Sequence, residues 1–177
     1  MYEIGDYIDL KQYQNSIVSR KEQNGYGDQY FTKEDIQFRV LYKDEERKKL
    51  VCIADKPTEQ ELYLKGKEGY KNGIAELDRI CKEISGYENA RSMTIEDIEN
   101  SKYWEEQDKK KTNMIFGEDE ENAYWIANEQ IRYYNNFKSF RMFIVSGDAV
   151  DAYGLYYSDS DYDSGRFAVR PVVEIEY

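Results

Sequence analysis

The residues best suited to chemistry lie between positions 131 and 166, in a stretch made largely of Tyr, Asn, Ser, Asp, Gly, Arg and Phe. A Tyr ring offers a large contact area while freezing few torsions, and small polar residues adapt their hydrogen bonds, so this composition is typical of binding surfaces. The predicted ligand-binding residues are Tyr133, Tyr134, Asn135, Asn136, Tyr153, Tyr156, Tyr157, Asp159, Asp161, Tyr162 and Arg166. The alternative is a Tyr-rich sheet whose rings only cover strand faces, since Tyr also favours strands.

Catalytic chemistry has little support in the sequence. The chain contains no His, which excludes Ser–His and Cys–His nucleophiles and His-based metal sites. Its 36 acidic residues place some carboxylate pair at almost any separation, so a glycosidase assignment has no basis. We therefore expect a non-enzymatic protein without a cofactor.

The segment 159–165 alternates Asp with other residues, as calcium-binding loops do. The spacing departs from the EF-hand pattern, because Gly165 is one place late and the twelfth position is Arg170 instead of Glu. A solvated turn without metal is the preferred interpretation, and calcium binding near Asp159 and Asp163 is the alternative.

Composition and charge exclude several classes of binding partner. The formal net charge of −11 would repel a phosphate backbone, and no basic stripe with interleaved aromatic residues is evident, so we expect no nucleic-acid partner. No apolar run approaches the ~18 residues that span a bilayer, and the first residues lack the pattern of a signal peptide. We expect synthesis in the cytoplasm and no membrane insertion. Cys52 and Cys81 are expected to be buried free thiols, with a disulfide between them as the alternative.

The first half of the chain predicts strands followed by two helices. A short opening strand is expected within residues 5–10, a surface loop at 15–33, and a hairpin of strands 36–42 and 50–54 around a charged turn. Apolar residues at helical spacing predict a helix over 73–84 that stops at Gly86. Thr94 and Asp97 form a capping box that predicts a second, shorter helix.

The second half predicts a charged surface excursion and a return to strands. Residues 101–122 are highly charged, with a few apolar residues such as Met114, Ile115 and Phe116 to anchor them. Strands are expected at 124–127, 140–146 and 169–177, with Pro171 at a sheet edge or at the start of its strand. The chain is expected to form one α+β domain over 1–177, with strands and helices in 1–100 and display loops in 123–177.

Several short stretches, taken in order, resemble a C-type-lectin-like domain family of bacterial and prophage-encoded proteins. The matching stretches are Gly5-Asp6-Tyr7, Phe38-Arg39-Val40-Leu41, Leu50-Val51-Cys52-Ile53-Ala54, Leu62-Tyr63-Leu64-Lys65-Gly66, Gly69-Tyr70-Lys71-Asn72-Gly73, Ala90-Arg91-Ser92-Met93-Thr94-Ile95-Glu96-Asp97-Ile98, Tyr124-Trp125-Ile126-Ala127 and Val169-Arg170-Pro171-Val172-Val173. Members typically continue the Tyr-Trp strand with a small and a basic residue, where this chain has Asn128-Glu129.

The resemblance implies a C-type-lectin-like fold, with small antiparallel sheets, two helices and long loops. It also implies that the segment between the Tyr-Trp and Arg-Pro strands is a display surface. We expect a phage or prophage virion surface or tail protein, present as a homo-oligomer or multi-copy array, that binds a host-surface glycan or protein. The alternative is a decoration protein that uses this face to pack against other virion subunits. Structural relatives include formylglycine-forming oxidases, but Cys52 and Cys81 lie outside the C-terminal region where that site would be expected.

Overall fold

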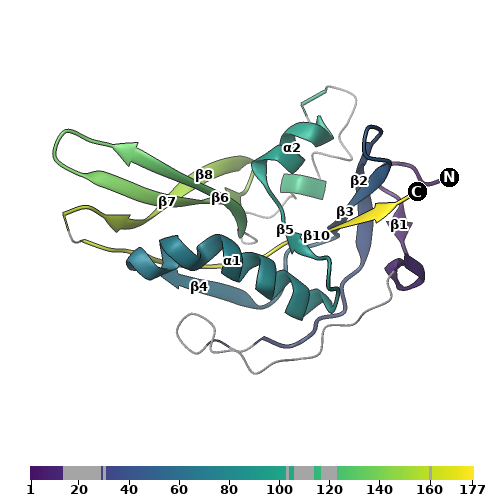
Figure 1. Cartoon of the computed structure of the whole chain (residues 1–177), viewed down its shortest axis with the longest axis horizontal. Coiled ribbons are helices and arrows are strands. Elements are labelled where there is room, and N and C mark those ends of the chain that lie inside the picture. The colour runs from purple at the N-terminus through teal and green to yellow at the C-terminus, as the bar shows by residue number, and fades with distance from the viewer. Residues whose placement is uncertain (14–28, 30, 103, 106–113, 117–122, 160) are drawn as a thin grey trace.

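The computed structural model describes residues 1–13, 29, 31–102, 104–105, 114–116, 123–159 and 161–177. It is an α+β structure with two mostly antiparallel five-stranded sheets, one long helix and shorter helices (Figure 1). The elements are β1 (Tyr7–Ile8), η1 (Leu10–Tyr13), β2 (Phe38–Asp44), β3 (Lys49–Ala54), β4 (Glu61–Lys65), α1 (Gly66–Ser85), β5 (Arg91–Ser92), α2 (Ile95–Ser101), β6 (Tyr124–Tyr133), β7 (Lys138–Ser146), β8 (Ala149–Tyr157), β9 (Ser164–Ala168) and β10 (Pro171–Glu176).

The first sheet has the order β1-β2-β3-β10-β5 and joins the two ends of the chain. The predicted hairpin is confirmed as the antiparallel pair of β2 and β3. Its simple alternation is broken by an irregularity between Val40 and Tyr42, which leaves Leu41 and Tyr42 both buried. Pro171 is the first residue of β10, where its missing amide does not interrupt the ladder.

The second sheet has the order β4-β9-β6-β7-β8 and contains most of the predicted display segment. The strand expected at 124–127 extends to Tyr133, and the strand expected at 140–146 begins at Lys138. Strands β4, β8 and β9 were not predicted. Residues 128–133 and 149–157, which were expected in loops on either side of the predicted strand 140–146, therefore belong to strands.

The two helices confirm the capping signals but not all of the predicted bounds. Gly86 adopts φ 77° and ends α1, and the capping box of Thr94 and Asp97 opens α2. Helix α1 begins at Gly66, earlier than the apolar pattern indicated. Gly69 and Gly73 are buried there, and a Cβ atom would lie 3.2 Å from Leu64 at Gly69 and 3.1 Å from Met142 at Gly73. These glycines let the first turns of α1 lie close to the second sheet.

Two clusters of buried side chains lie on the two faces of the first sheet. On one face, Leu77, Ile80, Cys81 and Ile84 of α1 pack against a cluster that includes Cys52. On the other face the cluster includes Ile98 of α2 and the short helical segment 114–116. The expected anchoring role of Met114, Ile115 and Phe116 is thereby confirmed, while the rest of 106–122 and most of the loop predicted at 15–33 lie outside the described residues.

Both cysteines are buried free thiols, as predicted. Burial raises the pKa of Cys52 to about 12 and raises that of Cys81 well above its ordinary value. Neither thiol is therefore suited to act as a nucleophile near neutral pH.

The molecule is elongated, and its ends differ (Figure 1). The β6–β7 hairpin, the outer end of β8 and the turn that follows project at one end, while both chain termini lie together at the other. Met1, Tyr2 and Tyr177 line one shared cleft, which confirms that the termini are adjacent. Among the described residues, no helix is long and apolar enough to cross a membrane.

Candidate functional site

The predicted binding residues gather mainly at the projecting end of the second sheet, which we call the tip and define as residues 129–141, 153–163 and the first turn of α1. Asn135 and Asn136 are exposed in the turn between β6 and β7, which is closed by the Tyr134 amide donating to the Phe137 carbonyl at 2.9 Å. The turn after β8 is tied to this hairpin, because the Ser158 amide donates to the Lys138 carbonyl at 2.9 Å. Asp159 and Asp161 are exposed in that second turn.

One row of side chains crosses the sheet on the face that α1 covers. Ile131, Phe140 and Tyr156 lie directly opposite one another on β6, β7 and β8, and Tyr162 pairs with Tyr156 in an isolated bridge. Residues directly opposite in antiparallel strands share a face. Tyr70 of α1 contacts the Phe140 ring edge-on at 5.2 Å, so the middle of the row is anchored to the helix.

The outer end of this row borders a shallow cleft of about 370 Å³ at the start of α1. Tyr156 and Tyr162 form one wall, and the Lys65–Glu68 segment forms the other. The Lys65 ammonium lies 4.9 Å from the centre of the Tyr162 ring, and the Lys67 ammonium lies 6.0 Å from that of Tyr156. With Tyr133 69 % and Tyr162 61 % exposed, this side of the tip offers aromatic surface beside positive charge.

A second aromatic group lies on the opposite face of the same hairpin. The rings of Tyr134 and Phe137 stack at 4.6 Å, and Phe137 meets Tyr157 edge-on at 6.0 Å. The Arg132 guanidinium lies over the Tyr134 ring at 5.1 Å, and Arg141 donates to the Tyr134 hydroxyl at 2.6 Å. The structure therefore divides the predicted tyrosines between two faces of the tip.

Two predicted residues lie apart from these groups. Tyr153 is half-buried, donates its hydroxyl hydrogen to the Ser164 carbonyl at 2.8 Å and contacts Trp125 edge-on, which is a packing arrangement. Arg166 is exposed on β9, with its guanidinium over the Tyr63 ring of β4 at 5.3 Å.

The carboxylates of the second turn are engaged in local hydrogen bonds. One oxygen of Asp159 accepts from the Asp161 amide at 3.3 Å, and one of Asp163 accepts from the Ser164 amide at 2.8 Å. In the part of the chain that the structure describes, no group of three or more His, Cys, Asp or Glu residues is placed to hold a metal ion.

Trp125 holds the base of the tip in place. Its indole N–H donates to the Leu62 carbonyl at 2.9 Å, which joins β6 to β4, and its ring packs edge-on against Phe167 and Tyr153. Gly165 makes room for this aromatic group, because a Cβ atom there would lie 2.9 Å from Phe167 and Tyr153 and 3.0 Å from Trp125.

We expect Gly165→Ala to lower the free energy of unfolding by about 1–3 kcal/mol, since three packed rings would have to shift. Gly154→Ala is the matched control. Its new methyl group would meet the end of the half-exposed Tyr157 side chain, which can rotate away, so we expect a loss below about 1 kcal/mol. Chemical denaturation with near-ultraviolet circular dichroism measures both, and equal losses would contradict the packing role of Gly165.

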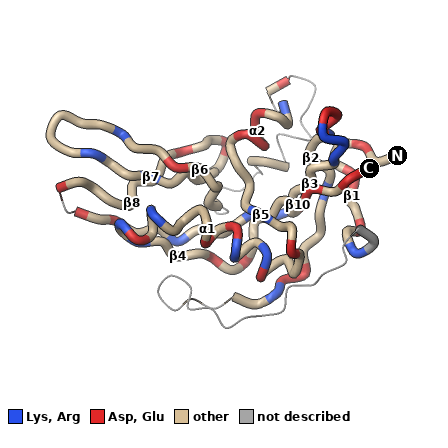
Figure 2. Tube along the Cα trace, viewed as in Figure 1, with Lys and Arg blue, Asp and Glu red and all other residues tan. Residues whose placement is uncertain are grey.

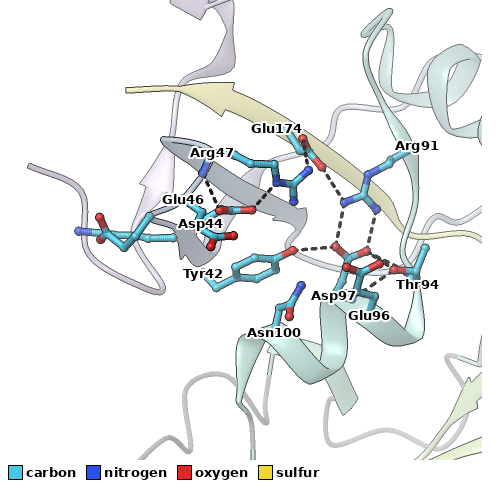
Figure 3. Close-up of a pocket in the computed structure, with 12 residues that line it drawn as sticks. Tyr42, Asp44, Glu46, Arg47, Arg91, Thr94, Glu96, Asp97, Asn100 and Glu174 are labelled. Atoms are coloured by element: carbon cyan, nitrogen blue, oxygen red, sulfur yellow. Dashed lines mark hydrogen bonds and ion pairs between the residues drawn. The ribbon is translucent and has the colours of Figure 1, made fainter.

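A second candidate is a cleft of about 680 Å³ between the β2–β3 turn and α2 (Figure 3). Its floor is a set of ion pairs centred on Asp97, which is 2 % exposed. Arg91 holds both oxygens of that carboxylate at 2.7 and 2.8 Å and also donates to Glu174 at 3.1 Å. The Tyr42 hydroxyl donates to Asp97 at 3.1 Å, and the Thr94 amide does so at 2.8 Å.

Electrostatics in this cleft follow from the pairing. Burial alone would raise the pKa of Asp97. The hydrogen bonds and charge of Arg91, together with hydrogen bonds from Thr94, hold this pKa below its ordinary value. Glu174 behaves likewise, because Lys49 and Arg91 lower its pKa against the opposing effect of burial. Burial, and then the charge of Asp97, raise the pKa of Tyr42 to about 12.

These contacts identify the floor of the cleft as a structural clamp that joins β2, β5, α2 and β10. The central carboxylate is already surrounded by protein donors, so it is not free to bind a ligand. Sequence reasoning found Asp97 only as a capping residue and missed the clamp. The available signal was Arg91 at the other side of the same short connection, although its reach to Asp97 depends on the β5–α2 geometry.

The chain was compared with protein-family models, with curated proteins and with solved structures, and none of the three comparisons found a match.

Proposed function

We propose that this protein is a non-enzymatic surface or tail component of a phage or prophage particle, and that its tip binds a host-surface glycan or protein. The observation that carries the proposal is a cluster of aromatic rings at the end of the molecule remote from both termini (Figure 1). There the exposed Tyr133, Tyr134 and Tyr162 adjoin the half-exposed Phe137, Tyr156 and Tyr157. Exposed aromatic residues flanked by polar groups are typical of recognition surfaces, where they supply contact area with little loss of side-chain entropy.

The proposal includes a C-type-lectin-like fold. Three features support it. The N-terminal β1 and the C-terminal β10 belong to one sheet, α1 and α2 precede the display segment, and the segment between Trp125 and Arg170 forms the projecting hairpins. In this arrangement the first sheet and the helices hold the frame while the second sheet presents its outer end.

A decoration protein that packs this face against another virion subunit is the second candidate. One observation favours it. Ile131 is 39 % exposed in the same row as Phe140 and Tyr156, and an exposed aliphatic residue beside aromatic rings suits a permanent interface.

The test replaces Tyr133, Tyr156 and Tyr162 together by Ala in particles that carry the protein. We expect the rate of adsorption to host cells to fall at least about tenfold, because weak single-site contacts are multiplied across many copies. The control is Tyr7→Ala with Tyr177→Ala, which removes two exposed tyrosines outside the tip. Normal adsorption combined with loss of particle heat stability would overturn recognition and support the decoration role.

A further inference from the structure

Most of the described arginines outside the second sheet pair with carboxylates, although Arg170 lies over the Tyr124 ring instead. Arg39, Arg47, Arg79 and Arg91 all pair with carboxylates. In the second sheet and at the start of α1, six cations each contact a tyrosine. These pairs are Lys65 with Tyr162, Lys67 with Tyr156, Arg132 with Tyr134, Lys138 with Tyr133, Arg141 with Tyr134 and Arg166 with Tyr63.

The β6–β7 hairpin is also segregated in charge. Residues 130–147 contain Arg132, Lys138 and Arg141 and no acidic residue, in a chain whose net charge is −11 (Figure 2). Within the described part of the chain, none of these three cations forms an ion pair with a carboxylate. A tyrosine ring attracts a cation without neutralising it, so the positive charge stays available to an external anion.

Two of the cations share one face. Arg132 lies opposite Ser139, and Arg141 is two residues further along β7, so the two arginines are diagonal neighbours whose Cα atoms are about 7–8 Å apart in this geometry. Both approach Tyr134, one over its ring at 5.1 Å and one at its hydroxyl at 2.6 Å. A second hydrogen bond, from Arg141 to the Ser139 hydroxyl at 3.1 Å, fixes that guanidinium further.

Because both guanidinium groups contact the same tyrosine and carry like charge, an anion that bridges them would offset their mutual repulsion. Each guanidinium has five N–H donors, and the two hydrogen bonds of Arg141 leave three of its donors for a ligand. A carboxylate, sulfate or phosphate group matches such donors well, since arginine binds planar or tetrahedral oxyanions through paired hydrogen bonds.

We propose that this face binds an acidic saccharide, with its anionic group between Arg132 and Arg141 and a sugar ring against Tyr134 and Phe137. The inference rests on the proposed recognition function and specifies its ligand class. The faces of the Tyr134 ring are engaged by Phe137 and Arg132, so the sugar would meet the exposed edges of these rings. The exposed amides of Asn135 and Asn136 can serve its hydroxyl groups.

A nucleic acid fits this face less well. The basic face is only two or three cations wide, and the neighbouring turn, which is tied to Lys138, carries the exposed carboxylates of Asp159 and Asp161. A chain with a phosphate at every nucleotide would run onto these carboxylates, whereas a saccharide with sparse acidic groups need not.

The experiment measures binding of the full chain to two matched pairs of polymers at low and physiological salt. The pairs are polygalacturonate with its methyl ester, and dextran sulfate with dextran, so that charge changes while the sugar backbone is kept. We expect binding to at least one anionic member and not to its neutral counterpart.

We expect Arg132→Gln with Arg141→Gln to weaken that binding at least about tenfold, because charge-assisted hydrogen bonds are lost. Lys11→Gln with Lys56→Gln removes two exposed cations outside β6–β8 and should leave binding unchanged.

The outcomes separate this inference from the recognition function. Equal binding of the neutral and anionic members, insensitive to the arginine change, would overturn the anionic inference and keep glycan recognition. Adsorption of particles that depends on the tyrosines, with no binding to any of the polymers, would also overturn it and favour a protein receptor. Tighter binding to an oligothymidylate single strand than to either anionic saccharide would replace the saccharide by a nucleic acid.

Discussion

Arg170→Met is expected to lower the free energy of unfolding by about 3–5 kcal/mol, the range found when one partner of a buried charged contact is removed. Arg170 is only 3 % exposed, and its guanidinium donates to three carbonyl groups. The distances are 3.0 Å to Ala54, 3.0 Å to Ile115 and 3.1 Å to Asp55. It also lies over the Tyr124 ring at 5.3 Å. A single side chain thus connects the end of β3, the segment 114–116 and β6. Met would remove a donor from each of the three carbonyl oxygens, and that of Ile115 would keep only the Tyr124 hydroxyl.

The measurement is chemical or thermal denaturation, in which the midpoint temperature should fall by about 6–20 °C for a chain of this size. Arg166→Met is the control, because that arginine is exposed and its removal should change the unfolding free energy by less than about 1 kcal/mol. If both variants unfold at the same denaturant concentration, the three carbonyl contacts do not stabilise the fold as argued.

Asp97→Asn is expected to cost about 3 kcal/mol at neutral pH, since it removes the charge that compensates Arg91 in a buried position. The neighbouring Glu96→Gln provides the control. Glu96 lines the same cleft but is exposed, so its change should stay within about 0.5 kcal/mol.

The cost of Asp97→Asn should depend on pH. The folded-state pKa of Asp97 lies below its ordinary value of 3.8, and that of Glu174 lies below 4.5. A lowered pKa means that the unfolded chain takes up protons first as the pH falls. Stability from these groups is therefore complete above the ordinary values and is lost as the pH falls through the folded-state values. The gap between parent and Asp97→Asn should narrow over that range, and a gap that is constant from pH 7 to pH 2 would rule out the ionised clamp.

The sequence predicted those parts of the first sheet and the helices that depend only on neighbouring residues. The hairpin of β2 and β3, the stop at Gly86 and the capping box of Thr94 each depend on neighbouring residues, and all three are present. The start of α1 was missed because Gly66, Gly69 and Gly73 weaken the helical pattern. Their small size is required by the second sheet, which packs against them, and this contact cannot be read from the sequence.

The tip shows what local signals could not predict. Most of the predicted residues are exposed or half-exposed, but their division between two faces depends on strand register. Tyr133 and Tyr134 are adjacent in sequence and therefore point to opposite sides of the hairpin near its turn. Polar-aromatic strands such as β8 lack the apolar alternation that identifies a strand, so these residues were expected in loops. The basic character of the hairpin was likewise missed, because the net charge of the whole chain conceals it.

The reactivity of the two buried thiols can be used to measure opening of the folded core. Cys52 and Cys81 lie in the core on β3 and α1, and a modifying reagent can reach them only when that core opens. With reagent in excess, the rate of labelling follows either the population of the open form or the rate of opening, depending on how fast the core recloses. A cysteine introduced at the exposed position of Asn135 would react at once in the folded protein. The tip could therefore be labelled while Cys52 and Cys81 remain unmodified.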